Sequence, residues 1–409
     1  MRNIRARLVL ATALALAPLS LAAQEQAEVI HYWTTESESR AVKVFADAFA
    51  AAGGTWIDNA IAGGNAARQA ALTRILAGDP PTASQFIAST QFEDLVSQGL
   101  LAPVADPATT DAWLKVMPSA LTDIAMRNGS FYALPLNIHG ISWIWYDVKA
   151  LEALGVSAPT GWGEDMFAAM DAAKAAGKIP FAMAGQPNFE LPVFHSIMLY
   201  IGGSELWDGV YREGSEEAMM GDKMRATFET FARLREYSDP GAPGRTWNAA
   251  IQMIVRGEAV FASMGDWAKG EFKANGWQPG VDFGCTLPGG ILSIGGDVFV
   301  FPVQPTDAKR QAQAALLQVL TDPVVLRDFA IAKDAIPPRR DVDMAGADIC
   351  TQAGETALKS PETALPRLSL LKNSSVIGEI QDLVSEFWNT PSMTVDEAME
   401  RHAQIVIDG

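Results

Sequence analysis

The sequence EVIHYW at residues 28–33 opens the stretch of chain that decides the fold. It alternates and is rich in β-branched and aromatic residues, so we expect a strand. The elements expected after it alternate between helix and strand, with glycines or a proline turn between them: helix 37–52, strand 56–61, helix 66–77 and strand 86–88. This alternation is the pattern of a parallel α/β sheet.

The middle of the chain breaks this pattern. Residues 132–146 are extended, include Pro135, and have helical stretches on either side, which suits a crossover between two lobes. Further strand signals lie at 259–264 and 291–302, and further helices are expected at 149–154, 164–176, 194–201, 222–237, 308–320, 376–389 and 395–406. We therefore expect an α/β protein of two lobes that the chain crosses several times.

The composition is that of a folded, acidic protein. Of 409 residues, 49% are hydrophobic and 19% are charged, and 48 acidic residues against 31 basic ones give a net charge of −17. This excludes disorder, collagen and coiled coil as descriptions of the whole chain. Nucleic acids and anionic lipids attract basic surfaces, so we expect neither as a partner. We expect a monomer.

The N-terminus is typical of an export signal. Three arginines precede an apolar run at 8–21 that is too short to span a membrane, and small residues follow it. We expect a signal peptide at 1–23, cut after Ala22 or Ala23; the alternative is a buried N-terminal helix. No cysteine follows the run, so we expect a periplasmic protein without a lipid anchor.

Common catalytic and cofactor-binding motifs are absent from the sequence. No two of the four histidines have metal-ligand spacing, and no GxGxxG, GxxxxGK[ST] or GxSxG motif occurs. We therefore expect no metal and no cofactor. With 48 acidic residues, a pair of glycosidase carboxylates stays open, and it would make the chain a secreted glycoside hydrolase.

Two clusters combine tryptophan with polar residues: YWTTESE at 32–38 and GDWAKG at 265–270. An indole offers a flat apolar face with a hydrogen-bond donor at its edge. Beside carboxylates and amides, such a face suits a sugar, whose C–H face stacks while its hydroxyls form hydrogen bonds. The alternative is that these tryptophans belong to a core or to an interface between lobes.

Several short motifs together resemble one known family. They are HYWT at 31–34, AGDPPT at 77–82, IWYD at 144–147, PTGWGE at 159–164, GEA at 257–259 and MGDWAKG at 264–270. In this order and spacing they look like the extracellular solute-binding proteins of ABC-type sugar importers, the group that includes maltose-binding protein. The resemblance spans essentially the whole mature chain and is closest to bacterial periplasmic glucose-binding proteins.

The resemblance implies the two-lobed periplasmic binding protein fold, with three interlobe crossings and a ligand cleft. It places residues 24–138 and 281–320 in an N-terminal lobe, and residues 139–280 and 321–409 in a C-terminal lobe. It also implies a receptor and not an enzyme. The lobes close on a sugar, and permease subunits of the ABC transporter in the inner membrane read the closed form.

The resemblance further implies the ligand-binding residues. Carried over onto this sequence, the set is Tyr32, Trp33, Glu38, Gln91, Trp267, Asp297 and Lys333, with Asn65, His139 and Lys372 as further candidates. Alternatively, Asp297 and Lys333 form a charge pair on a lobe surface.

Two residues of the glucose-binding subgroup are missing. Ala88–Gln91 stands where a lysine is expected, and Leu370–Lys372 stands where a histidine is expected. The ligand therefore stays open between a glucose-like monosaccharide or small glycoside and a disaccharide or charged sugar derivative.

Cys285 and Cys350 are the only cysteines of the chain. In an exported protein the simplest expectation is one disulfide, and both residues lie where the glucose-binding subgroup has a cysteine pair. The alternative is two separate buried thiols.

Overall fold

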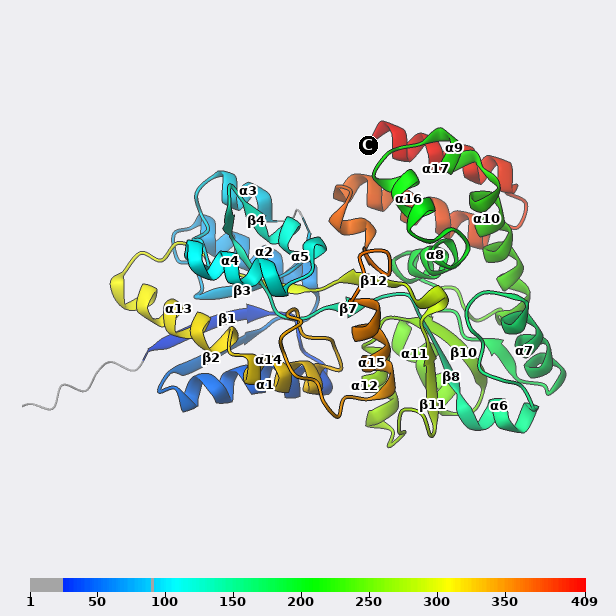
Figure 1. The fold of residues 1–409 in the computed structure, drawn as a ribbon, viewed down its shortest axis with the longest axis horizontal. Coiled ribbons are helices and arrows are strands. Elements are labelled where there is room, and N and C mark those ends of the chain that lie inside the picture. The colour runs from blue at the N-terminus through cyan, green and yellow to red at the C-terminus, as the bar shows by residue number, and fades with distance from the viewer. Residues whose placement is uncertain (1–24, 90–91) are drawn as a thin grey trace, which may run out of the picture.

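The computed structural model describes residues 25–89 and 92–409, so the expected signal peptide at 1–23 and Gln91 lie outside the described residues. Figure 1 shows two lobes side by side, each with helices packed around β-strands. The expected α/β fold of two lobes is confirmed.

The first lobe is built on a five-stranded sheet. Its strands, in spatial order, are β2 (Thr55–Ala60), β1 (Gln26–His31), β3 (Ala83–Ile87), β13 (Asp297–Val300) and β6 (Ala133–Pro135). β1 pairs in parallel with β2 and β3, as the alternation of strand and helix predicts. β13 returns from far along the chain and pairs antiparallel with β3, which places Asp297 opposite Ile87 at the carboxyl end of β3.

Helices cover this sheet. They are α1 (Glu36–Ala51), α2 (Gly64–Leu76), α3 (Glu93–Ser97), α4 (Pro107–Val116), α5 (Ser119–Ala125), α13 (Asp307–Leu320) and α14 (Pro323–Lys333), and a small hairpin joins β4 (Met126–Arg127) to β5 (Ser130–Phe131). α1 begins with a capping box. The Thr35 side chain accepts a hydrogen bond from the backbone amide of Glu38, and the Glu38 side chain accepts one from the backbone amide of Thr35. α14 packs against α1 through the stacked rings of Phe45 and Phe329, whose centroids lie 4.1 Å apart.

The second lobe contains a four-stranded sheet in the order β11 (Phe283–Thr286), β8 (Trp143–Asp147), β10 (Ala259–Met264) and β9 (Ile179–Phe181). Its helices are α6 (Val148–Leu154), α7 (Glu164–Ala175), α8 (Pro187–Tyr211), α9 (Glu216–Met220), α10 (Asp222–Leu234), α11 (Trp247–Val255), α12 (Ala268–Ala274), α15 (Ile349–Ala357), α16 (Ser374–Asn389) and α17 (Val395–Asp408). Large buried side chains, among them Trp207, Phe228 and Phe387, form a core between these helices.

A three-stranded sheet of β14 (Ala364–Pro366), β12 (Leu292–Gly295) and β7 (His139–Gly140) lies between the lobes (Figure 1). β7 leads from β6 of the first lobe to β8 of the second, and β12 leads back into β13. A third passage lies beside the first, because Ile138 and Ile336 form an antiparallel bridge. The chain thus crosses between the lobes three times, as expected.

The expected division of the chain between the lobes stays a proposal, and the packing shifts two of its boundaries. β11 lies in the segment 281–320 that was expected in the first lobe, yet it pairs with β8 of the second. α14 was expected in the second lobe, yet it packs against α1. We propose lobes of 25–138 plus 296–335, and 139–295 plus 336–409.

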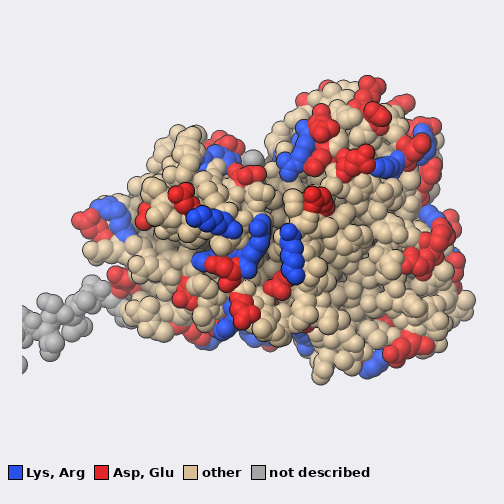
Figure 2. All heavy atoms as spheres, in the orientation of Figure 1, with Lys and Arg blue, Asp and Glu red and all other residues tan. Residues whose placement is uncertain are grey.

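The surface carries the excess of acidic residues on both lobes. Figure 2 shows Asp and Glu side chains spread over the visible face, with several Lys and Arg side chains near the junction of the lobes. No helix within residues 25–89 and 92–409 combines the length and the apolar character that crossing a membrane requires.

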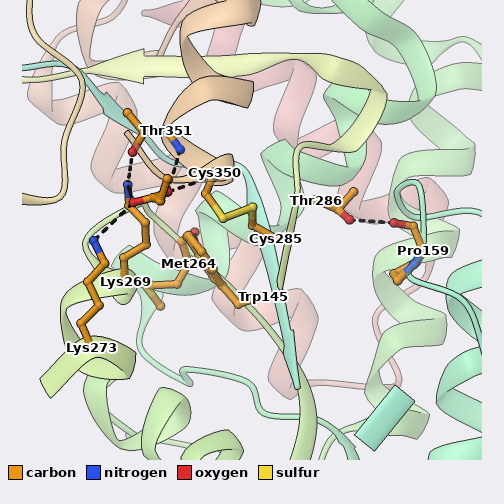
Figure 3. Close-up of a disulfide and its surroundings, with 10 residues drawn as sticks. Trp145, Pro159, Met264, Lys269, Lys273, Cys285, Thr286, Cys350 and Thr351 are labelled. Atoms are coloured by element: carbon orange, nitrogen blue, oxygen red, sulfur yellow. Dashed lines mark hydrogen bonds and ion pairs between the residues drawn. A yellow bond between two sulfur atoms is a disulfide. The ribbon is translucent and has the colours of Figure 1, made fainter. Parts of the chain in front are cut away.

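A disulfide joins Cys285 of β11 to Cys350 of α15, which confirms the expected pairing (Figure 3). It ties an edge strand of the second sheet to a helix that follows the third passage between the lobes. This region lies next to the turn that carries Trp267.

Candidate ligand-binding site

A cavity of about 460 Å³ lies where the two lobes meet. Asn65 and Ile87 line it from the first lobe, and Phe189, Trp267 and Gln381 are among the residues that line it from the second. A ligand in this cavity contacts both lobes at once, so its binding stabilises the arrangement in which the lobes are close together.

Trp267 forms part of the apolar wall of this cavity. Its ring packs against the backbone of Gly265, where an added β-carbon would come within 2.2 Å of the ring. The indole also meets the ring of His139 edge-on, with centroids 5.6 Å apart. Trp267 is half-buried, so part of its surface remains open to a ligand.

The elements on either side of Trp267 are anchored (Figure 3). Before it, the indole nitrogen of Trp145 donates to the last carbonyl of β10 at 3.0 Å. After it, Lys269 on α12 is 2% exposed and donates to Thr351 Oγ1 at 2.6 Å. Lys269 also lies 3.5 Å from Asp348, the residue that caps the N-terminus of α15. The disulfide-linked helix α15 therefore helps to hold the tryptophan in position.

Next to the cavity wall, Asp297 accepts four side-chain hydrogen bonds. Its Oδ1 accepts from Tyr32 at 2.6 Å and from Gln85 at 3.0 Å. Its Oδ2 accepts from Asn137 at 3.0 Å and from His139 at 3.2 Å. Burial raises the pKa of Asp297, but these donors, His139 above all, outweigh burial and lower it. The carboxylate is therefore ionised, and its acceptor positions are occupied.

His139, on β7 between the lobes, links two carboxylates. Its Nδ1 lies 2.7 Å from Asp266 in the second lobe, and its Nε2 lies 3.2 Å from Asp297 in the first. Burial alone lowers the pKa of His139, but the charges and hydrogen bonds of the two carboxylates outweigh it and raise the pKa to about 9. The charged imidazole therefore ties β13 to the turn that carries Trp267.

Glu38 and Lys333 form an ion pair with an N–O distance of 3.5 Å, in which the lysine side chain is 5% exposed. The ammonium group of Lys333 also helps to lower the pKa of Asp297, but its ion-pair partner is Glu38. Neither residue of the pair lines the cavity. Asp297 does not line it either.

Of the expected residues that the structure describes, only Asn65 and Trp267 line the cavity. Trp33 is 1% exposed and packs on Phe299 and Phe329, with ring centroids 5.8 and 5.3 Å away, so the structure places it in the core of the first lobe. Lys372 donates to the carbonyl of Val406 in the last turn of α17 at 3.4 Å, a position where helix carbonyls attract cations. Gln91 lies outside the described residues.

Sequence reasoning missed several polar residues on the second-lobe side of the cavity. Ser263 and Ser369 line it, and their buried hydroxyls have no hydrogen-bond partner among the described residues. Arg367 lines it too. The available signal for Arg367 was a lone charge within the apolar run ALPRLSLL at 364–371. The two serines carried no such signal.

The lining suits reversible binding of an organic solute. It combines apolar side chains with amides and hydroxyls, and none of its described residues is acidic. Within residues 25–89 and 92–409, no three His, Cys, Asp or Glu side chains are grouped as metal ligands.

Residues 44–353 match the family of bacterial extracellular solute-binding proteins. The chain belongs to this family. It is 32% identical over 394 residues to a probable sugar-binding periplasmic protein of Mesorhizobium japonicum, with 94% of each chain covered.

Two solved structures share the fold of this solute-binding protein. One is the solute receptor AcbH, described as preferring β-D-galactopyranose, with a TM-score of 0.76, 16% identity, and coverage of 93% of this chain and 97% of that one. The other is RafE in complex with raffinose, with a TM-score of 0.71, 18% identity, and coverage of 93% and 99%. Members of this family are extracellular or periplasmic transport receptors.

Proposed function

We propose that this solute-binding protein is the periplasmic receptor of an ABC-type sugar importer, and that it captures a glucose-like monosaccharide or a small glycoside between its lobes. The observation that carries the proposal is the indole of Trp267 on a cavity that both lobes line. An aromatic face stacks on the C–H face of a sugar, and nearby amides and hydroxyls bond to the sugar hydroxyls. The name of the relative from Mesorhizobium japonicum supports a sugar as ligand.

A disaccharide is the second candidate. The cavity of about 460 Å³ lies within the range of about 300–1,000 Å³ that is common for ligand pockets. Of the two similar structures, one receptor is described as preferring galactopyranose and the other is in complex with raffinose. The fold therefore accommodates sugars of more than one size.

A receptor is favoured over a secreted glycoside hydrolase. A glycosidase places two carboxyl groups on either side of the bond that it cleaves. None of the described residues that line the cavity is acidic, and the nearby Asp266 and Asp297 are both bonded to His139. The arrangement therefore supports binding without bond cleavage.

The proposal includes the path of the protein and its partners. Residues 1–23 act as the signal peptide, the mature protein is a periplasmic monomer without a lipid anchor, and permease subunits read its closed form. Because bound sugar favours that form, the permease distinguishes loaded from empty receptor.

A thermal-shift screen of the mature protein against monosaccharides and disaccharides tests the proposed function. A ligand of the folded state raises Tm by mass action, with about 2.7 kcal/mol of stabilisation at a hundred times Kd. We expect at least one sugar to raise Tm, and Trp267→Ala to reduce that shift. If no carbohydrate raises Tm, the proposed function is wrong.

A further inference from the structure

Arg367 is the one charged side chain among the described residues that line the cavity. The backbone amide of Arg367 donates to the carbonyl of Ile294 at 2.8 Å, which fixes the Arg367 backbone next to β12. Its side-chain stem packs against Gly295, where an added β-carbon would come within 2.4 Å of the arginine Cδ. The stem is therefore held in one place, and a larger residue at position 295 would displace it.

The guanidinium has no hydrogen bond or ion pair with any residue in the described part of the chain. The carboxylate that acts on its charge is Asp297, but both oxygens of Asp297 are already occupied by other donors. A guanidinium carries five N–H donors, and no described acceptor of the protein takes up those of the half-buried Arg367. An acceptor supplied by a ligand would satisfy them.

Two further donors on the same cavity lack partners. Ser263 is 5% exposed, and its hydroxyl has no hydrogen-bond partner among the described residues. The hydroxyl of Ser369, two residues after Arg367, is buried and equally unpartnered. Unpartnered buried polar groups in a cavity point to a ligand that bonds to them.

We propose that the sugar bound in this cavity carries a carboxylate, as in a hexuronic acid or an acidic unit of an oligosaccharide, and that Arg367 binds that carboxylate. The inference rests on the proposed function, because it names the class of sugar for the same cavity. A carboxylate accepts two parallel N–H bonds from a guanidinium, in a geometry that a neutral hydroxyl does not match.

The charge balance around the cavity supports this class of ligand. The chain as a whole has a net charge of −17, so an anion is repelled by most of its surface. Inside the cavity no described lining residue is acidic, and the nearby carboxylates Asp266 and Asp297 are bonded to the charged His139. A single cation in such a setting selects for an anionic group.

Calorimetry on the mature protein at pH 7 tests the inference with D-glucuronate, D-galacturonate and digalacturonate against D-glucose and D-galactose. We expect at least one acidic sugar to bind about tenfold or more tightly than its neutral parent, and its affinity to fall with added salt. Binding by digalacturonate but not by free hexuronates would assign the carboxylate to an oligosaccharide. Arg367→Gln should weaken acid binding about tenfold to a hundredfold, and weaken binding of the neutral parent sugar by much less.

Arg256→Gln is the matched control. Arg256 is 52% exposed and pairs with Glu258 outside the cavity, so its loss removes the same charge without touching the site. It should leave the preference for acidic sugars unchanged. Should Arg367→Gln fail to fold, Gly295→Ala displaces the arginine stem while keeping its charge, and it should remove the same preference.

Three results would separate the inference from the proposed function. Neutral sugars that bind as tightly as acidic ones, or an acid preference that survives in Arg367→Gln, would overturn the role of Arg367 and leave the receptor intact. Failure of every sugar to bind, acidic or neutral, would contradict the proposed function itself.

Discussion

Trp267 owes its place on the cavity wall to Gly265, because any β-carbon there would meet its ring. We expect Trp267→Ala to weaken sugar binding by about 2 kcal/mol, roughly thirtyfold in Kd, since the stacking surface is lost. Trp267→Phe should keep most of the affinity, and Gly265→Ala should weaken binding although the indole is still present. Calorimetric Kd values and the Tm of the ligand-free variants check this. Near-normal affinity with a strongly lowered Tm would mean that Trp267 is a core residue.

Sequence patterns located only part of the candidate site. The GDWAKG cluster at 265–270 indicated Trp267 as a residue that could stack on a sugar, and the structure places that residue on the cavity. Tyr32 and Trp33 are neighbours in the sequence, but Tyr32 bonds to Asp297 whereas Trp33 is buried in the core of the first lobe. Successive side chains at a strand end point to opposite faces. Arg367 and Ser263 line the same cavity but lie far apart in the sequence, so no local sequence pattern predicts that they come together.

Helices α8 and α17 of the second lobe share a buried chain, in which Tyr211 bonds to His195 at 2.9 Å and to His402 at 3.1 Å. Burial lowers the pKa of His402 from 6.5 to about 4. Between these pH values the unfolded chain binds more protons than the folded one. The free energy of unfolding should therefore fall as the pH drops from about 6.5 to 4, by up to about 3 kcal/mol for His402.

Thermal unfolding of the ligand-free protein between pH 7 and pH 4 checks this expectation. His402→Gln removes one titrating group and keeps a side chain that can bond to Tyr211, so it should reduce the slope of the profile over this range. His195, whose pKa burial also lowers, keeps part of the slope. Identical profiles for wild type and variant would show that His402 does not set the acid sensitivity.

The disulfide between β11 and α15 is the covalent link of the second lobe. It closes a loop with a sequence separation of 65 residues, and chain entropy assigns such a bond about 4 kcal/mol at most. Reduction should lower Tm but leave the far-ultraviolet circular dichroism at 25 °C unchanged, because each lobe has a hydrophobic core. Alkylation of both cysteines without reductant would show that the bond is absent in solution.

Local patterns predicted the first elements closely. β1, α1 and β2 begin and end within two residues of the expected ranges, because apolar periodicity and glycine stops are local signals. The place of β13 beside β3 and the packing of α14 on α1 depend on residues far apart in the chain. The division into lobes depends on such contacts, and the pairing of β11 and the packing of α14 shifted it.

The molecule as a whole is two lobes joined by three passages, with the candidate site between them. We propose that a sugar bound in this cavity holds the lobes together. Small-angle X-ray scattering with and without a saturating sugar, chosen by its thermal shift, tests this most directly. We expect a smaller radius of gyration with sugar bound, and an unchanged radius at confirmed saturation would contradict lobe closure on the sugar.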